Sequence, residues 1–167
     1  MLDWFYPDEY LDSTYEIDFK QLYDDGFRGI IFDIDNTLVE HGAPSDERSR
    51  ALLKSLKEMG FKVILLSNNS KSRVELFTEN IEDIDYISLA AKPLLFNYRK
   101  AMEKMGTDKR NTFFVGDQLF TDVWGAKRLG IRSILVKPIN AREEIQIVIK
   151  RKFENILLKR YNENENR

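Results

Sequence analysis

The chain has 167 residues, 43% of them hydrophobic, which suits one domain with an ordinary core and is short for two. Its 26 basic and 28 acidic residues leave a formal net charge of −2, which excludes the global positive field of a nucleic-acid-binding protein. The sequence has no cysteine, so disulfides and thiolate metal sites are excluded. It has no secretory signal at its start and no apolar run long enough to span a bilayer, and we therefore predict a soluble, cytoplasmic protein.

Residues 1–27 are rich in aromatic and acidic side chains. A short helix is expected from about Asp18 to Asp25, because Gly26 can end it. Two interpretations of the first aromatics stay open. The segment wraps the sheet, or Trp4, Phe5 and Tyr6 anchor the protein at a membrane boundary, where such rings are favoured.

Residues 28–39 read RGIIFDIDNTLV and predict a short buried strand that ends at Asp33. Asp33 and Asp35 then lie at the carboxyl end of a strand, where open parallel sheets bind their ligands. Two carboxylates this close repel each other, and a divalent cation between them would relieve the repulsion. The alternative is a strand exit in which Asp33, Asn36 and Thr37 only bond their own backbone.

A polar loop with the single histidine, His41, follows, and we expect this side chain to be solvated rather than catalytic. Ser45 is expected to cap a helix that Gly60 ends. Residues 62–67, KVILLS, form the second expected strand because they are apolar until their last position.

Polar residues after this second strand begin another helix near Ser70. The Ser67 hydroxyl and the amide nitrogens of a helix N-terminus make a natural phosphate cradle. Alternatively, residues 67–70 only cap the helix, and both interpretations can hold together. Lys71 and Arg73 could add positive charge at the rim, although exposed helix residues are usually only solvated.

The third strand is expected at residues 86–89, and Pro93 suits the first turn of the helix after it. Lys92 therefore precedes a helix that begins near the ligand-binding edge. A fourth strand at residues 112–115 is followed by Asp117, which either faces this edge or only caps a turn. A helix at residues 120–129 and a fifth strand at 133–136 complete the alternation, so we predict an α/β fold with a parallel five-stranded sheet.

The final helix is expected from about Arg142 to Tyr161, since apolar residues recur there at helical spacing. It either covers the sheet or presents the basic residues between Lys150 and Arg160 to anionic lipid. We expect one domain over residues 1–161 and a disordered polar tail at 162–167.

The spacing Asp33-x-Asp35-x-Thr37 after an apolar strand resembles the first motif of the haloacid dehalogenase superfamily of phosphotransferases. The strand that ends at Ser67, the lysine before Pro93 and the GDQLFTD segment after the fourth strand resemble its other motifs, in the same order. The resemblance implies a Rossmann-like sheet in which the first and fourth expected strands are neighbours.

The same resemblance implies a role for each motif residue. Asp33 would be the nucleophile that forms an aspartyl phosphate, and Asp35 would be the general acid and base. Lys92 would screen the crowded carboxylates. The residues implied to contact the phosphate are Thr37, Ser67, Lys92 and Asn68, the last through its main-chain N–H.

The implied cofactor is Mg²⁺, which prefers hard oxygen ligands and keeps several of its waters. Asp33, Asp35 and Asp117 would hold the ion in this resemblance. Asp122 would orient its water shell and contact Lys92.

Within this resemblance, Asp35 limits the choice of reaction, because dehalogenases lack this second acid. Its presence favours hydrolysis of a phosphomonoester. The short intervals from Asp35 to Ser67 and from Ser67 to Lys92 leave no room for an inserted cap domain, so the fold is expected to be capless and its site open. An open site favours a phosphate presented on something large, such as a macromolecule or a membrane.

In finer detail the segments FYPDEY, LLSNNS and VGDQLFTDVWGAKRLG resemble the YqeG-type subclass III phosphatases, whose relatives include phosphatidylglycerophosphate phosphatases. This resemblance implies that the substrate is the phosphate of a lipid head group. The protein would reach it through a peripheral contact with the membrane. The alternatives are small soluble phosphate esters, such as sugar phosphates or nucleotides, and a non-enzymatic binding module.

Overall fold

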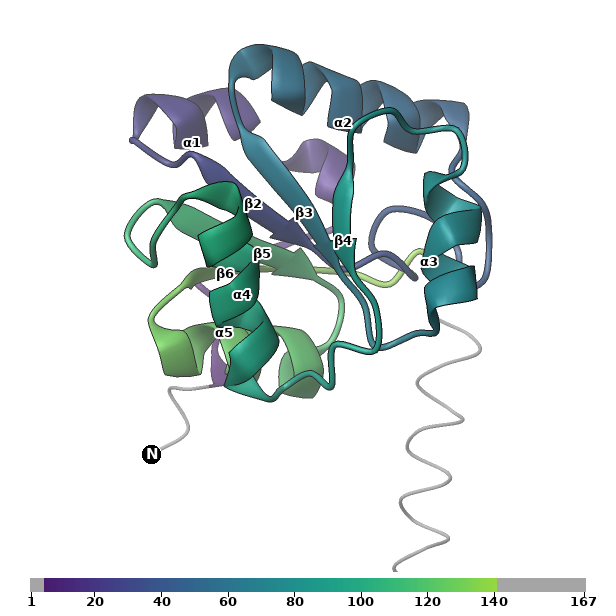
Figure 1. The fold of residues 1–167 in the computed structure, drawn as a ribbon. Helices are drawn as coiled ribbons and strands as arrows, with labels where there is room; N and C mark the ends of the chain where they lie inside the picture. The colour runs from purple at the N-terminus through teal and green to yellow at the C-terminus, as the bar shows by residue number, and fades with distance from the viewer. Residues whose placement is uncertain (1–4, 141–167) are drawn as a thin grey trace, which may run out of the picture.

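The computed structural model describes residues 5–140, which form a parallel six-stranded sheet in the order β1-β6-β5-β2-β3-β4 (Figure 1). The strands are β1 (Glu9–Leu11), β2 (Gly29–Phe32), β3 (Lys62–Leu66), β4 (Asp85–Ile87), β5 (Thr112–Gly116) and β6 (Arg132–Val136). The helices are α1 (Phe19–Asp24), α2 (Glu47–Met59), α3 (Lys71–Thr78), α4 (Leu95–Met105) and α5 (Trp124–Leu129), with single turns η2 (Thr14–Glu16) and η3 (Leu119–Val123). The α/β architecture expected from the sequence is confirmed.

Helices cover both faces of the sheet, because alternate residues of each central strand point to opposite sides. Ile30 and Phe32 of β2 belong to a core that includes residues of α1, α2 and α3. Ile31, between them, packs in a second core with Tyr98 of α4 and Ala126 of α5. Figure 1 shows α1 and α2 on one side of the sheet and α4 and α5 on the other. Strands buried on both faces appear in a sequence as continuous apolar runs, which explains why β2 is recognisable there.

The edge strand β1 is a difference from the five strands that the sequence predicts. It pairs in parallel with β6, with Leu11 opposite Val136. The Asp8 carboxylate, just before β1, accepts hydrogen bonds from the Ser133 main-chain N–H at 2.8 Å and from Lys127 Nζ at 2.7 Å. The prediction of five strands is wrong because β1 has only three residues, too few to show an apolar pattern of its own, and is ordered by its partner β6.

Three expected helix boundaries also differ. Asp46 rather than Ser45 caps α2, since its Oδ1 accepts from the Ser49 main-chain N–H at 2.7 Å. Pro93 lies in a turn before α4, whose first residue is Leu95, and is therefore not in the first helical turn. The helix expected at residues 120–129 is divided into the π-helical turn η3 and α5.

The aromatic N-terminal segment packs on the domain in part. The Phe5 ring lies 5.3 Å from the Phe120 ring and 5.6 Å from the Trp124 ring, measured between centroids, whereas Tyr6 is exposed. Trp4, the final helix expected from Arg142 to Tyr161 and the polar tail at 162–167 lie outside the described residues. Across residues 5–140, every helix is too short or too polar to cross a bilayer.

Candidate active site

The carboxyl ends of β2, β3 and β5 lie side by side, because β2 pairs with β3 on one side and with β5 on the other. The residues that follow these strands therefore meet at one edge of the sheet. Asp33 follows β2, Ser67 follows β3 and Asp117 follows β5. This edge is where open parallel sheets bind their ligands, so the sequence motifs converge in space as the resemblance implies.

A cluster of acidic residues occupies this edge. Asp33, Asp117 and Asp122 each offer a carboxylate oxygen, and these oxygens all lie within 4.8 Å of one another. Asp33 and Asp122 are buried, and Asp117 is half-buried. Hard oxygen donors at this spacing fit a divalent cation of the Mg²⁺ type.

The Lys92 ammonium bridges two members of this acid cluster. Its Nζ donates to Asp33 Oδ1 at 2.7 Å and to Asp122 Oδ1 at 2.7 Å, and its side chain is 3% exposed. Burial alone would lower the pKa of Lys92, but Asp122 and Asp33 outweigh it and raise the pKa above its usual range. Lys92 is therefore charged, and with three carboxylates it leaves two formal negative charges, the number that one divalent cation would balance.

The main chain of Lys92 is fixed by the predicted phosphate residue Asn68. Asn68 Nδ2 donates to the Lys92 carbonyl oxygen at 3.1 Å, and Asn68 Oδ1 accepts from the Lys92 main-chain N–H at 2.6 Å. The Asn68 side chain is thus engaged in holding Lys92 at the end of its loop. Its main-chain N–H is the part of Asn68 that the sequence analysis assigned to phosphate.

The environment of Asp33 makes its carboxylate easier to protonate than an ordinary aspartate. Burial and the nearby Asp122 carboxylate raise the pKa of Asp33 to about 6, although Lys92 opposes the shift. A cation bound at the cluster would favour the ionised form, which is the form that a nucleophile needs.

The position of Asp122 depends on a glycine. A Cβ at Gly116 would overlap the Asp122 carboxylate, so only glycine allows β5 to pass this close. The Gln118 main-chain N–H donates to Asp122 Oδ2 at 3.1 Å. Asp122 is thereby aimed at Lys92, as the resemblance implies, and lies in the acid cluster itself.

Two hydroxyl side chains predicted to contact phosphate lie at the same edge. Thr37 Oγ1 donates to Asp117 Oδ1 at 3.2 Å. Ser67 is buried, and its Oγ accepts from the Asn69 main-chain N–H at 3.1 Å. Thr37 is therefore tied to the acid cluster, whereas Ser67 Oγ donates no hydrogen bond within residues 5–140.

The Asp35 carboxylate lies outside the acid cluster, although the sequence analysis assigned it to the metal. Its Oδ1 accepts from the Gly42 main-chain N–H at 2.7 Å and from Arg73 Nη2 and Nε at 2.7 and 3.2 Å. Its Oδ2 accepts from Asn69 Nδ2 at 2.6 Å. The mostly exposed His41 lies farther away, with Nδ1 3.9 Å from Asp35 Oδ1.

Sequence reasoning missed the importance of Asn69 and Arg73. Arg73 is expected there as an exposed rim cation, but its side chain is only 13% exposed and pairs with Asp35. Helical spacing within α3 gives little warning of this burial, and the only signal for Asn69 is its place in the polar run after Ser67. The donors that bind the Asp35 carboxylate are thus set by how closely α3 approaches the loop after β2.

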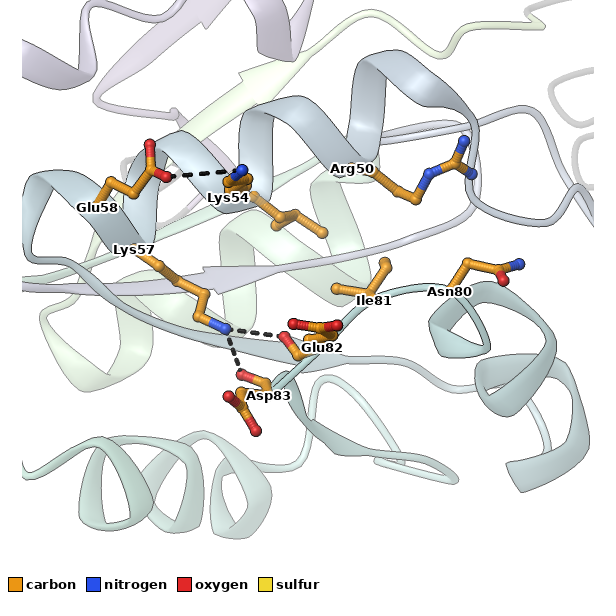
Figure 2. Close-up of a pocket in the computed structure, with 9 residues that line it drawn as sticks. Arg50, Lys54, Lys57, Glu58, Asn80, Ile81, Glu82 and Asp83 are labelled. Carbon is orange, nitrogen blue, oxygen red and sulfur yellow. Dashed lines mark hydrogen bonds and ion pairs between the residues drawn. The ribbon is translucent and has the colours of Figure 1, made fainter.

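Two surface hollows among residues 5–140 are lined by residues other than the predicted site residues. Figure 2 shows one of about 420 Å³ between α2 and the turn before β4. Lys57 Nζ crosses it to the main-chain oxygens of Glu82 and Asp83, at 2.8 and 2.9 Å, and Lys54 Nζ lies 3.9 Å from Glu58 Oε1. The Lys57 ammonium thus closes one side of this hollow through main-chain contacts, and no chemistry is assigned to it.

A second hollow, of about 490 Å³, is apolar and borders the segment between Asp117 and Asp122. Its lining comes from the N-terminal segment, η3 and β6: Phe5, Tyr6, Pro7, Tyr10, Leu119, Phe120 and Leu135. Tyr6, Tyr10 and Phe120 are all exposed. An apolar surface thus lies beside the loop that carries two of the clustered carboxylates.

Comparisons with known proteins agree with this geometry. Residues 40–130 match the family model described as haloacid dehalogenase-like hydrolase. The chain is 36% identical over 155 residues to "Probable phosphatase YqeG" of Bacillus subtilis, covering 92% of this chain and 90% of the relative.

Two weaker similarities concern a plant enzyme and a solved structure. Phosphatidylglycerophosphate phosphatase 1 of Arabidopsis thaliana is 28% identical over 162 residues, covering 87% of this chain but only 44% of that longer protein. An uncharacterized protein from Corynebacterium glutamicum has a similar fold, with a TM-score of 0.54 and 24% identity over 74% of this chain and 93% of the other. The structural similarity supports the Rossmann-like fold alone.

Proposed function

Because the chain belongs to the haloacid dehalogenase-like hydrolases and is a phosphatase of that family, we propose that it is a Mg²⁺-dependent phosphomonoesterase that forms an aspartyl phosphate at Asp33. The observation that carries the proposal is the buried Lys92 ammonium between Asp33 and Asp122, beside Asp117. When bound, Mg²⁺ would neutralise charge on the phosphate oxygens and carboxylates. Asp33 and Asp117 would hold it, with Asp122 completing the cluster. The assignment of Asp35 to the metal stays a prediction that its side-chain contacts do not support.

The proposed reaction consists of two displacements. In the first, a carboxylate oxygen of Asp33 bonds to phosphorus as the ester P–O bond breaks, and Asp35 gives its proton to the departing alcohol oxygen. In the second, Asp35 takes a proton from water, whose oxygen bonds to phosphorus as the bond to Asp33 breaks and phosphate leaves. The Lys92 ammonium and the Ser67 hydroxyl would stabilise the equatorial phosphate oxygens throughout.

Replacing the two acids separates these steps. Asp33→Asn removes the nucleophile and should abolish phosphate release, whereas Asp35→Asn should retain phosphoenzyme formation from an activated ester and lose its hydrolysis. Phosphate release with Mg²⁺ or with EDTA, together with acid-quench detection of the phosphoenzyme, measures both effects. Asp24→Asn, at an exposed pair with Lys20, is the control and should be active. Mg²⁺-dependent turnover by Asp33→Asn would disprove the assignment.

For the substrate we propose phosphatidylglycerophosphate, a lipid whose head group ends in a phosphomonoester. The plant relative is named for this substrate. The intervals that could have carried a cap are filled by α2 and β3 before Ser67, and by α3 and β4 before Lys92, which agrees with an open site. The exposed aromatic rings around the apolar hollow, Tyr6, Tyr10 and Phe120, would suit a membrane boundary beside the acid cluster.

The substrate proposal is tested by comparing phosphate release from phosphatidylglycerophosphate in mixed micelles with release from a panel of sugar phosphates and nucleotides. Preferential hydrolysis of the lipid, with sedimentation of the protein on anionic liposomes, is the expected result. Efficient hydrolysis of soluble esters without liposome association would favour the small-substrate alternative. Phosphate binding without turnover of any ester would favour a binding module.

A further inference from the structure

Four donor atoms from three residues hold the Asp35 carboxylate at the active-site edge. Its side chain is 92% buried from solvent by neighbours that include Gly42, Asn69 and Arg73. We propose that Arg73 is a positioning residue for catalysis, which with Asn69 decides that Oδ2 is the oxygen through which Asp35 exchanges its proton. This inference rests on the proposed function, since it assumes that Asp35 is the general acid and base.

Counting lone pairs distinguishes the two oxygens of Asp35. A carboxylate oxygen has two lone-pair sites. Oδ1 accepts from three donors: the Gly42 main-chain N–H, Arg73 Nη2 and Arg73 Nε. Oδ2 accepts from one, Asn69 Nδ2 at 2.6 Å. Oδ1 is therefore saturated, and Oδ2 keeps a site for the proton that passes to the leaving group and is later taken from water.

The guanidinium geometry supports a positioning role. An arginine that bonds both oxygens of a carboxylate would occupy Oδ2 as well, whereas Arg73 directs two nitrogens to Oδ1 alone. Its third nitrogen, Nη1, is buried and has no hydrogen-bond partner in the described chain. Within residues 5–140, the Arg73 guanidinium thus makes its hydrogen bonds with Asp35.

The position of Arg73 follows from the local structure of α3. Ser70 caps this helix and its Oγ accepts from the Arg73 main-chain N–H at 3.3 Å, which fixes Arg73 in the first turn. Val74 and Phe77 bury the adjoining face of α3 in the core. The helix is therefore a rigid support from which the arginine reaches the loop after β2. Asn69 comes from the turn just before it, so both donors move together with α3.

A purely structural role for the ion pair predicts a different outcome from a positioning role. If Arg73 only ties α3 to the loop, its loss should reduce activity toward all esters alike. If it positions the general acid, the loss should depend on the leaving group. A phenolate leaves without needing a proton, whereas an alkoxide must be protonated as its bond to phosphorus breaks. The value of kcat/KM reports this first step, because phosphoenzyme formation is included in it.

The experiment measures kcat/KM for Arg73→Gln and Arg73→Lys with p-nitrophenyl phosphate and with the alkyl ester that the wild-type protein hydrolyses fastest. We expect Arg73→Gln to lose about 100-fold or more with the alkyl ester and less than about 10-fold with the aryl ester, given the usual size of general acid catalysis. Arg73→Lys keeps the charge but not the paired donors and should fall between the two. Acid quenching of the aryl reaction should also reveal accumulated phosphoenzyme, because the same oxygen accepts the water proton.

Matched controls separate the possible failures. Arg110→Gln breaks an exposed Arg–Asp pair with Asp108 and should leave both kcat/KM values unchanged. If Arg73→Gln does not fold, Arg73→Lys carries the same comparison. Equal losses with both esters, or no loss with either, would overturn the role of Arg73 while leaving the phosphatase intact. Mg²⁺-dependent turnover by Asp33→Asn would instead overturn the proposed function beneath it.

Discussion

Replacing Lys92 with methionine tests whether the acid cluster is held together by this single buried cation. The change keeps a side chain of similar length but removes the charge that lies 2.7 Å from both Asp33 Oδ1 and Asp122 Oδ1. Removing one partner from a buried charge network costs about 3–5 kcal/mol, because the remaining charges stay buried without compensation. With an m value of about 2 kcal/mol/M, the urea midpoint should fall by about 2 M.

The loss of stability in Lys92→Met should depend on pH because of Asp33, whose pKa is raised to about 6 in the folded protein. The ordinary carboxyl pKa is about 3.9, so between these values the folded state binds more protons than the unfolded state and stability falls as pH rises. Without Lys92 the upward shift grows, since the lysine opposes it. The deficit of Lys92→Met should therefore be largest at pH 8 and smaller at pH 5, where Asp33 takes up a proton.

The assay is urea unfolding followed by far-ultraviolet circular dichroism, with EDTA present so that metal binding does not contribute. Lys20→Met is the matched control, because Lys20 forms an exposed pair with Asp24 and such pairs contribute about 0–1 kcal/mol. A deficit for Lys92→Met below about 1 kcal/mol, or one of equal size at both pH values, would refute the idea that Lys92 compensates the buried carboxylates.

Two other changes test features that support the site. Gly116→Ala should displace the Asp122 carboxylate, because the added Cβ would overlap it. We expect weaker Mg²⁺ binding, measured by calorimetry, and a kcat at least about 10-fold lower. Unchanged Mg²⁺ affinity would contradict this account of Asp122. Asp8→Asn should destabilise the β1 edge, because the carboxylate accepts from Lys127 and Ser133. Although burial opposes it, these partners lower the pKa of Asp8, so its contribution is present above the ordinary carboxyl pKa and is lost as pH falls through the lowered value. The difference in urea midpoint between wild type and Asp8→Asn should therefore shrink in acid, and a difference that stays constant would show that charge is not involved.

Residue patterns alone are enough to locate the central strands of the sheet and the chemistry at their ends. The segment at β2 is recognisable because a strand buried on both faces must be apolar at every position, and the acid that follows it marks where the strand stops. Lys92, Asp117 and Asp122 are likewise identified by motif order, and all of them meet Asp33 at the same edge. Local pattern is sufficient here because parallel strands bring their carboxyl ends together whatever the details of the connecting loops.

The pairing of the charged groups, in contrast, depends on how the helices and loops pack in three dimensions. Asp122 rather than Asp35 joins the carboxylate cluster, and Asp35 is held by Arg73 from 38 residues away. The edge strand β1 exists because β6 offers it a partner, not because its own residues form a strand pattern. Side-chain direction and burial depend on how separate helices approach the sheet, and residue spacing along the chain contains little information about that approach.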